Sequence, residues 1–251
     1  MDKKITLLIS SLLLAGQAWA TPINLSGSEQ NLQQVLDGIT VGGDSSVDVV
    51  NDQQAPDELW SLGATGGAMS QIVIEIAGYA PLNAFGVYDA ANPTRRVEMF
   101  SGAQAAGARS VLYINNDGSV WAGDMLAGTF GDSGVDFAGN LFGFYLQTPG
   151  GYWYSQSKLN SDQADHMLAF AGKNDWVQLP SSPAGKWDAN EFVLAWEDLA
   201  RPGWDYDYND FVVMVESVHA EVPEPGSLAL FGMGLAALGW TLRRRAVAGK
   251  V

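Results

Sequence analysis

The densest group of oxygen-bearing side chains in this sequence lies in residues 196–216, which read WEDLARPGWDYDYNDFVVMVE. Asp205, Asp207 and Asn209 are separated by single residues, so they share one side of an extended segment or surround a cation inside a folded loop. Arg201 is the only cation in the stretch, and the carboxylates therefore need solvent, retained protons or a bound cation to offset their repulsion. Because Ca²⁺ prefers carboxylate and amide oxygens, the spacing predicts a calcium site. The predicted ligands are Asp205, Asp207, Asn209 and Asp210, with Glu197 and Asp198 as direct or supporting ligands.

Other interpretations of this acidic stretch stay open. It is a solvated turn between two strands, or two of its carboxylates serve as the acid and the base of a hydrolase. An EF-hand is not indicated, because Asp210 stands where the EF-hand loop needs glycine and the β-branched run after it predicts a strand. His166 is a candidate to orient the acidic stretch through a hydrogen bond, and its alternative is a structural role in a loop.

The same residues resemble the signature of the domain of unknown function 4114 family, which occurs in bacterial secreted proteins. The motif consists of EDL, a short spacer and DYDYNDFVV, and its upstream part is FGFYL at 142–146, SKLN at 157–160 and Asp165-His166. The resemblance covers residues 140–218. It implies an acidic site that can bind Ca²⁺, and it implies no defined activity.

The N-terminus has the pattern of a secretory signal. Lys3 and Lys4 precede an apolar run at residues 5–15, and the sequence Ala18-Trp19-Ala20 matches a signal-peptidase site. Residues 1–20 are therefore predicted to be removed, which leaves Thr21 as the first residue. A membrane anchor is the alternative, although the apolar run is shorter than the ~20 residues that span a bilayer.

The C-terminal segment, residues 222–251, resembles the PEP-CTERM sorting signal of Gram-negative bacteria. It combines a Pro-Glu-Pro motif, an apolar run at residues 227–242 and three arginines. The resemblance implies recognition by an exosortase-type membrane protease, and a location at the cell surface or in the extracellular polysaccharide matrix. The arginines favour an inner-membrane intermediate with a transmembrane helix whose arginine end is cytoplasmic, and a permanent anchor is the alternative. The residues that carry the two sorting predictions are Ala18, Ala20, Pro223, Glu224, Pro225, Arg243, Arg244 and Arg245.

The charge and the composition exclude several classes of function. The 251-residue chain has a net charge of −15, which disfavours nucleic acid and anionic membrane surfaces as partners. It has no cysteine, so disulfides, thiolate catalysis and iron–sulfur clusters are excluded. With two histidines in the whole chain, a histidine-rich transition-metal site is not indicated either.

Residues 21–220 predict one mainly antiparallel β-sandwich or jelly-roll domain, because short apolar segments recur between Gly, Pro and Asn residues. The sequence Asn-Asn-Asp-Gly at 115–118 predicts a hairpin, and Ser28 is predicted to cap one short helix before the strands. The apolar stripe of this helix consists of Leu32, Val35, Leu36 and Ile39. Strands are predicted at residues 47–50, 71–76, 84–88, 97–100, 111–114, 119–121, 141–147, 152–155, 176–179, 192–196 and 211–218. The sorting segment adds a C-terminal hydrophobic helix.

Three further motifs bear on function. FGVY at 85–88 and FGFY at 142–145 are similar, which permits an internal repeat. GDSG at 131–134 resembles the serine-protease nucleophile motif, but no histidine precedes it and a turn is predicted instead. Trp204, Tyr206 and Tyr208 alternate with the acidic residues, and exposed rings at these positions would stack on sugars.

These features predict an exported, non-enzymatic protein of the cell surface or extracellular matrix, stabilised by Ca²⁺ and structural or adhesive in role. A carbohydrate-binding module of the exopolysaccharide matrix is the first alternative, and a carboxylate-dependent hydrolase is the second. Signal peptidase and an exosortase-type protease are the predicted partners, with extracellular polysaccharide as a candidate. The membrane is contacted through the C-terminal segment before processing.

Overall fold

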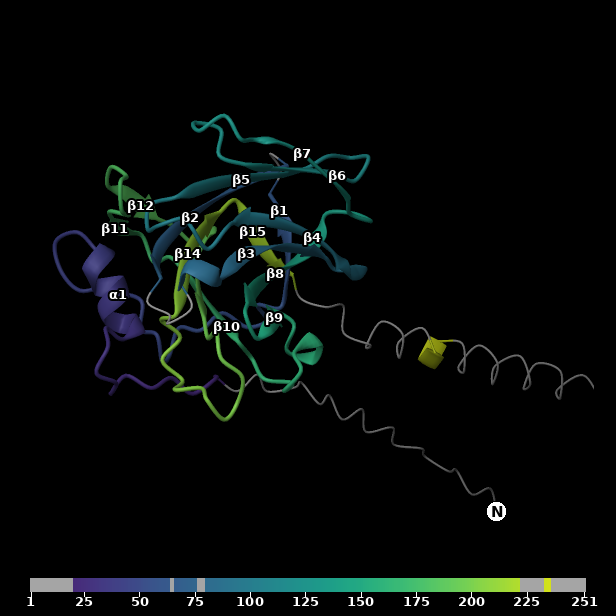
Figure 1. Cartoon of the computed structure of the whole chain (residues 1–251). Helices are drawn as coiled ribbons and strands as arrows, with labels where there is room; N and C mark the ends of the chain where they lie inside the picture. Colours follow the sequence, from purple (N-terminus) through teal and green to yellow (C-terminus); the bar gives the residue numbers. More distant parts are fainter. Residues whose placement is uncertain (1–19, 64–65, 76–79, 222–232, 236–251) are drawn as a thin grey trace, which may run out of the picture.

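The computed structural model describes residues 20–63, 66–75, 80–221 and 233–235, and it contains two main β-sheets (Figure 1). All the strand pairs in them are antiparallel, which confirms the predicted mainly antiparallel β fold. The larger sheet has the order β10 (Met167–Ala171), β13 (Glu191–Trp196), β14 (Phe211–Glu216), β2 (Gly67–Glu75), β5 (Arg109–Ile114), β6 (Ser119–Gly123) and β7 (Gly131–Asp136). The smaller sheet has the order β15 (Val218–Glu221), β1 (Leu59–Leu62), β8 (Leu141–Thr148), β3 (Ala84–Asp89) and β4 (Asn92–Phe100), and β9 (Gly151–Tyr154) pairs with β8.

The two sheets pack face to face through aromatic side chains. Trp60 of the smaller sheet meets Phe192 of the larger one with ring centroids 4.9 Å apart. Phe85 and Phe211 make a second bridge between the sheets at 5.4 Å. Aromatic contacts of this kind add about 0.5–1.5 kcal/mol each to the burial of their area. The sandwich core is therefore held by large rings that both sheets contribute.

The larger sheet also has a second core on its outer face. The helix α1 (Leu32–Ile39) and the hairpin β11 (Asp175–Val177) to β12 (Gly185–Trp187) lie on one side of the molecule and cover this face (Figure 1). Strands β13 and β14 are consequently buried on both faces. This two-sided burial explains why their sequences are almost continuously apolar instead of alternating.

The helix α1 has the predicted apolar stripe, but its cap differs from the prediction. Leu32, Val35, Leu36 and Ile39 are all buried, as expected. The prediction that Ser28 is the cap is wrong, because Asn31 occupies that position. Its side chain accepts from Gln34 N, and the Gln34 side chain accepts from Asn31 N. This capping box pairs two amide groups that the first turn would otherwise leave unpaired.

Most predicted strands are present, and two of the predicted ranges are wrong. Residues 47–50 form a turn, because the Asp48 side chain accepts from Val50 N and draws the backbone out of the extended form. The last predicted strand, 211–218, is interrupted at Ser217, whose φ of 61° ends β14 and begins β15. The chain crosses there from the larger to the smaller sheet. The prediction lacks the strands β1, β7, β10 and β12.

The two FG-x-Y motifs pair with each other. In the antiparallel register of β3 and β8, Gly86 lies opposite Tyr145 and Tyr88 lies opposite Gly143. A Cβ atom at Gly143 would overlap the Tyr88 ring, and one at Gly86 would overlap the Tyr145 ring. In each motif, the tyrosine thus packs over the glycine of the other motif. The similarity of the two motifs therefore reflects the symmetric packing of one antiparallel strand pair.

The predicted terminal segments lie mostly outside the described residues. This applies to residues 1–19 and to residues 222–251 except 233–235, which are helical. Within the part of the chain that the structure describes, no helix is long and apolar enough to cross a membrane.

We expect Gly143→Ala to destabilise the domain, because the added methyl group overpacks the contact with Tyr88. Overpacking of a buried contact costs about 1–3 kcal/mol, and urea denaturation measures it. Gly139→Ala is the matched control, since no atom lies within 4 Å of its added carbon. Equal denaturation midpoints for the two variants would contradict the tyrosine–glycine packing.

Candidate metal site

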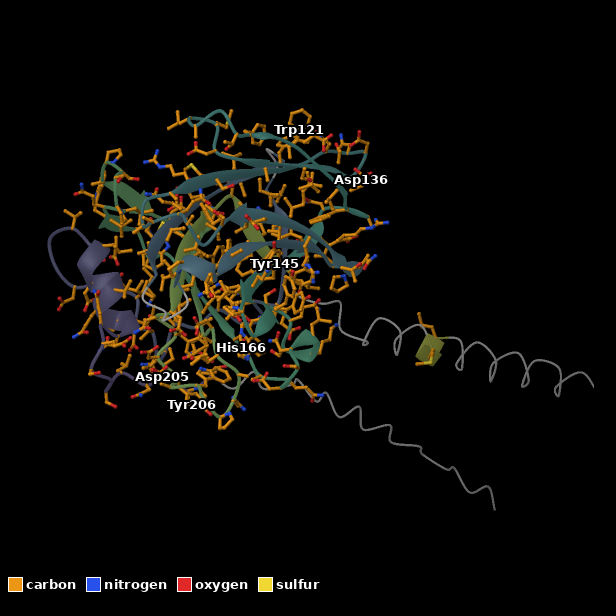
Figure 2. All side chains as sticks on the ribbon, in the orientation of Figure 1. Trp121, Asp136, Tyr145, His166, Asp205 and Tyr206 are labelled. Carbon is orange, nitrogen blue, oxygen red and sulfur yellow. The ribbon has the colours of Figure 1, made fainter. Side chains whose placement is uncertain are left out.

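The acidic stretch is the connection between the two central strands β13 and β14. Trp196 and Phe211 are paired in the ladder, so the connection leaves and re-enters the sheet at one point. Glu197 and Asp198 thereby come close to Asp210, and the Asp198 amide donates to Asp210 Oδ2 at 2.9 Å. Figure 2 shows this loop, marked by Asp205 and Tyr206, at the end of the molecule opposite Asp136.

Three of the predicted ligands converge. Glu197, Asp205 and Asp207 each have a carboxylate oxygen within 4.8 Å of the others. Oxygens that share one Ca²⁺ at 2.3–2.6 Å lie at most about 5 Å apart, so this spacing fits the ion. Asp205 is exposed, whereas Glu197 is 1 % and Asp207 is 4 % exposed. The group thus has one open side and two buried carboxylates.

The backbone of the loop is held in an uncommon conformation. Tyr206 and Tyr208 both have positive φ values, 67° and 53°. A left-handed conformation costs a residue with a Cβ about 1–2 kcal/mol. Two contacts fix the carboxylates in place: Tyr208 N donates to Glu197 Oε1 at 3.0 Å, and Asn209 N donates to Asp207 Oδ1 at 3.3 Å. The segment is therefore curled over its carboxylates, and it is not extended.

Asn209 adds a buried acceptor beside the three carboxylates. Its Nδ2 donates to Asp207 Oδ2 and to the carbonyl oxygen of Gln30, both at 2.8 Å. The residue is fully buried, and its Oδ1 has no hydrogen-bond partner. An unpaired buried acceptor costs about 1–3 kcal/mol, and a cation or a water molecule would satisfy it. Through Gln30, Asn209 also ties the loop to the segment before α1.

Burial raises the pKa values of the carboxylates in this loop. It is the largest cause for Glu197, whose pKa rises to about 9, and repulsion from Asp210 raises it further. Burial likewise raises the pKa of Asp210 to about 8, with Asp198 as the next charge that raises it. The pKa of Asp207 rises to about 6 through burial and through the neighbouring Asp205. Without a cation the loop therefore retains protons near neutral pH, and a cation would displace them.

The structure gives Asp198 and Asp210 supporting positions, outside the group of three carboxylates. Asp198 Oδ2 accepts from Asn83 Nδ2 at 3.1 Å. Asp210 Oδ2 accepts from the Asp198 amide, as described above. Both therefore hold the base of the loop together, and Asp210, when ionised, repels Glu197.

His166 supports the loop through stacking and backbone contact. Its ring lies between Trp153 and Trp204, at centroid distances of 3.9 and 4.6 Å, and Trp204 stacks in turn on Tyr206 at 4.9 Å. Its Nδ1 lies 3.1 Å from the carbonyl oxygen of Glu197, and its Nε2 lies 3.1 Å from Asp162 Oδ2. Burial lowers the pKa of His166. Both ring nitrogens face protein oxygens, and the contact of Nδ1 with the carbonyl oxygen of Glu197 holds the backbone of that residue in place.

The other candidate residues have structural roles or lie outside the described part. Trp204 and Tyr208 are 6 % and 0 % exposed, so they belong to the second core and present no open face to a sugar. The turn predicted for GDSG at 131–134 is wrong, because these residues begin strand β7, which pairs with β6. The Ser133 hydroxyl donates to the carbonyl oxygen of Val120 in β6, so its role is structural. Among the sorting residues, Ala20 lies within the described residues, where it is exposed.

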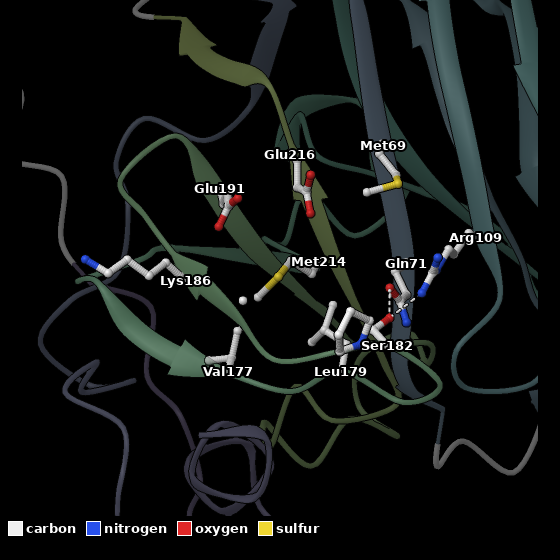
Figure 3. Close-up of a pocket in the computed structure, with 12 residues that line it drawn as sticks. Met69, Gln71, Arg109, Val177, Leu179, Ser182, Lys186, Glu191, Met214 and Glu216 are labelled. Atoms are coloured by element: carbon white, nitrogen blue, oxygen red, sulfur yellow. Dashed lines mark hydrogen bonds between the residues drawn. The ribbon is translucent and has the colours of Figure 1, made fainter. Parts of the chain in front are cut away.

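Two further carboxylates, which were not predicted as site residues, line a cavity of about 240 Å³ (Figure 3). Glu191 of β13 and Glu216 of β14 face each other in the ladder, and burial raises the pKa of both. Met69 and Met214 form part of the cavity wall. The two glutamates are far apart in the sequence, so only the strand register brings them together.

We expect the metal-free protein to become less stable as the pH rises from about 4, where unfolded carboxylates titrate, toward 9, the pKa of folded Glu197. In this window the folded state holds protons on Glu197, Asp207 and Asp210 that the unfolded chain has released. Thermal melts in chelator at several pH values measure the loss. Glu197→Gln cannot release a proton, so its midpoint should fall less steeply than that of the wild type. Parallel pH profiles for the two proteins would contradict the buried Glu197.

Two family comparisons give matches. Residues 128–218 match the family described as Domain of unknown function (DUF4114). The matched range begins upstream of the range 140–218 that the motif predicts. Residues 221–245 match the PEP-CTERM protein-sorting motif. Comparisons with curated proteins and with solved structures give no significant match. The chain is thus an exported protein that carries a DUF4114 domain, which includes the acidic loop, followed by a PEP-CTERM motif, a signal for export to the cell envelope or surface in Gram-negative bacteria.

Proposed function

We propose that the acidic loop binds one Ca²⁺ ion, and that the ion stabilises this exported domain in a structural or adhesive role at the cell surface. The observation that carries the proposal is the convergence of Glu197, Asp205 and Asp207 within 4.8 Å without a cationic side chain among them. Asn209, whose Nδ2 donates to Asp207, has a buried Oδ1 without a hydrogen-bond partner among the described residues, and this atom is the candidate fourth oxygen. Water molecules on the open side at Asp205 would complete the six to eight ligands that Ca²⁺ takes.

The chemistry of the ligands favours Ca²⁺ over other metals. All four candidate atoms are carboxylate or amide oxygens, and the ring nitrogens of nearby His166 face other protein atoms. Mg²⁺ prefers a strict octahedron and keeps several waters, whereas a loop with ligands at uneven depth suits the flexible coordination of Ca²⁺. Extracellular calcium modules bind with dissociation constants of roughly 10⁻⁴–10⁻³ M, which suits an exported protein.

Burial favours a structural role over catalysis. Glu197 and Asp207 are almost completely buried, and a glycosidase needs two carboxyl groups that face a substrate across a cleft. Trp204 and Tyr208 of the loop are buried as well, and Tyr206 is partly buried, which leaves one partly exposed ring there and argues against a broad sugar-stacking surface. We therefore propose a non-enzymatic protein. Its sorting motif is of the kind that exosortase-type machinery recognises, and extracellular polysaccharide is the partner we propose for the delivered domain.

We expect millimolar Ca²⁺ to raise the melting temperature of the chain that begins at Thr21, relative to the same chain in chelator. For a Kd of roughly 10⁻⁴ M, 1 mM Ca²⁺ is a tenfold excess, and binding to the folded state contributes about 1.4 kcal/mol. For a domain of this size that corresponds to roughly 3–6 °C. Asp207→Asn removes a ligand charge and should abolish most of the shift, and calorimetric titration measures the affinity directly.

Asp136→Asn is the matched control, because Asp136 is exposed and lies at the opposite end of the molecule (Figure 2). This variant should keep the full calcium shift. A wild-type melting temperature that is the same in calcium and in chelator would overturn the proposed calcium site.

A further inference from the structure

Another acidic cavity, separate from the acidic loop and from the cavity of Glu191 and Glu216, lies at the start of the described chain. It has a volume of about 550 Å³, and it is formed by the first residues, the loop before β1 and the segment before β10. Asp57, Glu58 and Asp165 line it, and no lysine or arginine of the described chain, which begins at Ala20, is among its lining residues. These carboxylates belong to different parts of the chain from the acidic loop, and the proposed calcium site does not use them.

Thr21 is seated in this cavity through three hydrogen bonds. Its backbone nitrogen donates to Gln53 Oε1 at 2.8 Å, and Gln53 Nε2 donates back to the carbonyl oxygen of Thr21 at 2.8 Å. Its hydroxyl group donates to Asp165 Oδ2 at 2.8 Å. Gln53 is itself fixed by a bridge to Phe170 of β10. The nitrogen of Thr21 is therefore positioned through Gln53, and the hydroxyl group of the same residue contacts a carboxylate.

Among the described residues, no lysine or arginine lines the cavity beside its carboxylates. Burial raises the pKa of Asp57 well above its usual range, and repulsion from Asp165 raises it further. Burial also raises the pKa of Asp165 to about 6, Glu58 adds to this increase, and the charge of Arg201 opposes it. A cation placed at the nitrogen of Thr21 would offset this repulsion.

Thr21 is also the first residue after the predicted signal-peptidase site. We propose that the α-amino group of Thr21, created when the signal peptide is removed, binds in this cavity as the cation that Asp57, Glu58 and Asp165 require. Cleavage of the Ala20–Thr21 bond consumes one water molecule: Ala20 leaves with a carboxylate, and the Thr21 nitrogen becomes an ammonium group. Removal of the signal peptide thereby stabilises the folded domain.

The geometry suits an ammonium group with three donors. One N–H keeps the existing contact with Gln53 Oε1. The other two N–H groups form when the bond to Ala20 is cleaved, and Ala20 lines the same cavity. The Thr21 side chain already reaches Asp165, so the charge forms next to its counter-charge without movement of the chain. An α-amino group has an ordinary pKa of about 7.7–8.0 and is charged at neutral pH.

The test compares three forms of the chain that ends at Val251: one with a free Thr21, one with an acetylated Thr21, and one that retains Ala20. Acetylation keeps the amide donor to Gln53 and removes only the charge. The retained Ala20 moves the charge one residue away. All melts are run in chelator, so that the outcome does not depend on the calcium site. We expect the free form to melt about 3 °C or more above both other forms, which corresponds to one well-placed ion pair in a domain of this size.

Combining the Asp165→Asn substitution with the free and acetylated forms tests whether Asp165 is the counter-charge of the amino group. This variant should lose most of the difference between the free and acetylated forms, whereas Asp44→Asn, at an exposed aspartate, should keep it. Equal melting temperatures of the free and acetylated wild-type forms would overturn the proposal, and that comparison changes no side chain. A difference that Asp165→Asn leaves intact would overturn the role of Asp165.

Discussion

Burial of carboxylates without cationic partners is the constraint on which the functional end of this domain depends. The ion pairs of the described residues are Arg95–Asp89 and Lys173–Asp52, with His166–Asp162 as a hydrogen-bonded pair, and none of them includes a carboxylate of the acidic loop. The loop is held instead by backbone amides and by rings. An isolated buried charge is costly, so each carboxylate must hold a proton or share a cation. The calcium ion proposed for this loop would replace the retained protons.

The rest of the fold makes that burial possible. Strands β13 and β14 lie inside the larger sheet and are covered on both faces, so the residues that leave their paired ends start from a rigid position. The stack from Trp153 through His166 and Trp204 to Tyr206 connects the loop to β9 and to the segment before β10. The same packing that shields the carboxylates therefore couples their state to both cores.

The domain has no cysteine, although it is exported to a compartment where many small domains rely on disulfides. The two proposed contacts would act as cross-links of a different kind. The proposed calcium ion would join Glu197, directly after β13, to Asp205 and Asp207 of the following loop. The proposed ammonium group of Thr21 would join the N-terminus to Gln53 and to the carboxylates near it, one of which, Asp165, accepts from the Thr21 hydroxyl group. Both proposed contacts depend on opposite charge in partly buried surroundings.

The sequence alone determined the local features of this protein. It determined the mainly antiparallel strands, the apolar stripe of α1, the hairpin at Asn115–Gly118, the family of the acidic motif and the sorting motif, because each is encoded by neighbouring residues. Only the tertiary structure decided which acidic residues converge. Asp205, Asp207 and Glu197 meet because Tyr206 and Tyr208 adopt positive φ values, which no local pattern of tyrosines predicts. The pairing of Glu191 with Glu216, and of Thr21 with Asp165, depends on strand register and on chain segments that are distant in sequence. The spacing of residues determines which side chains share one face of a strand or helix. Packing between segments that are distant in the sequence determines which other side chains that face contacts.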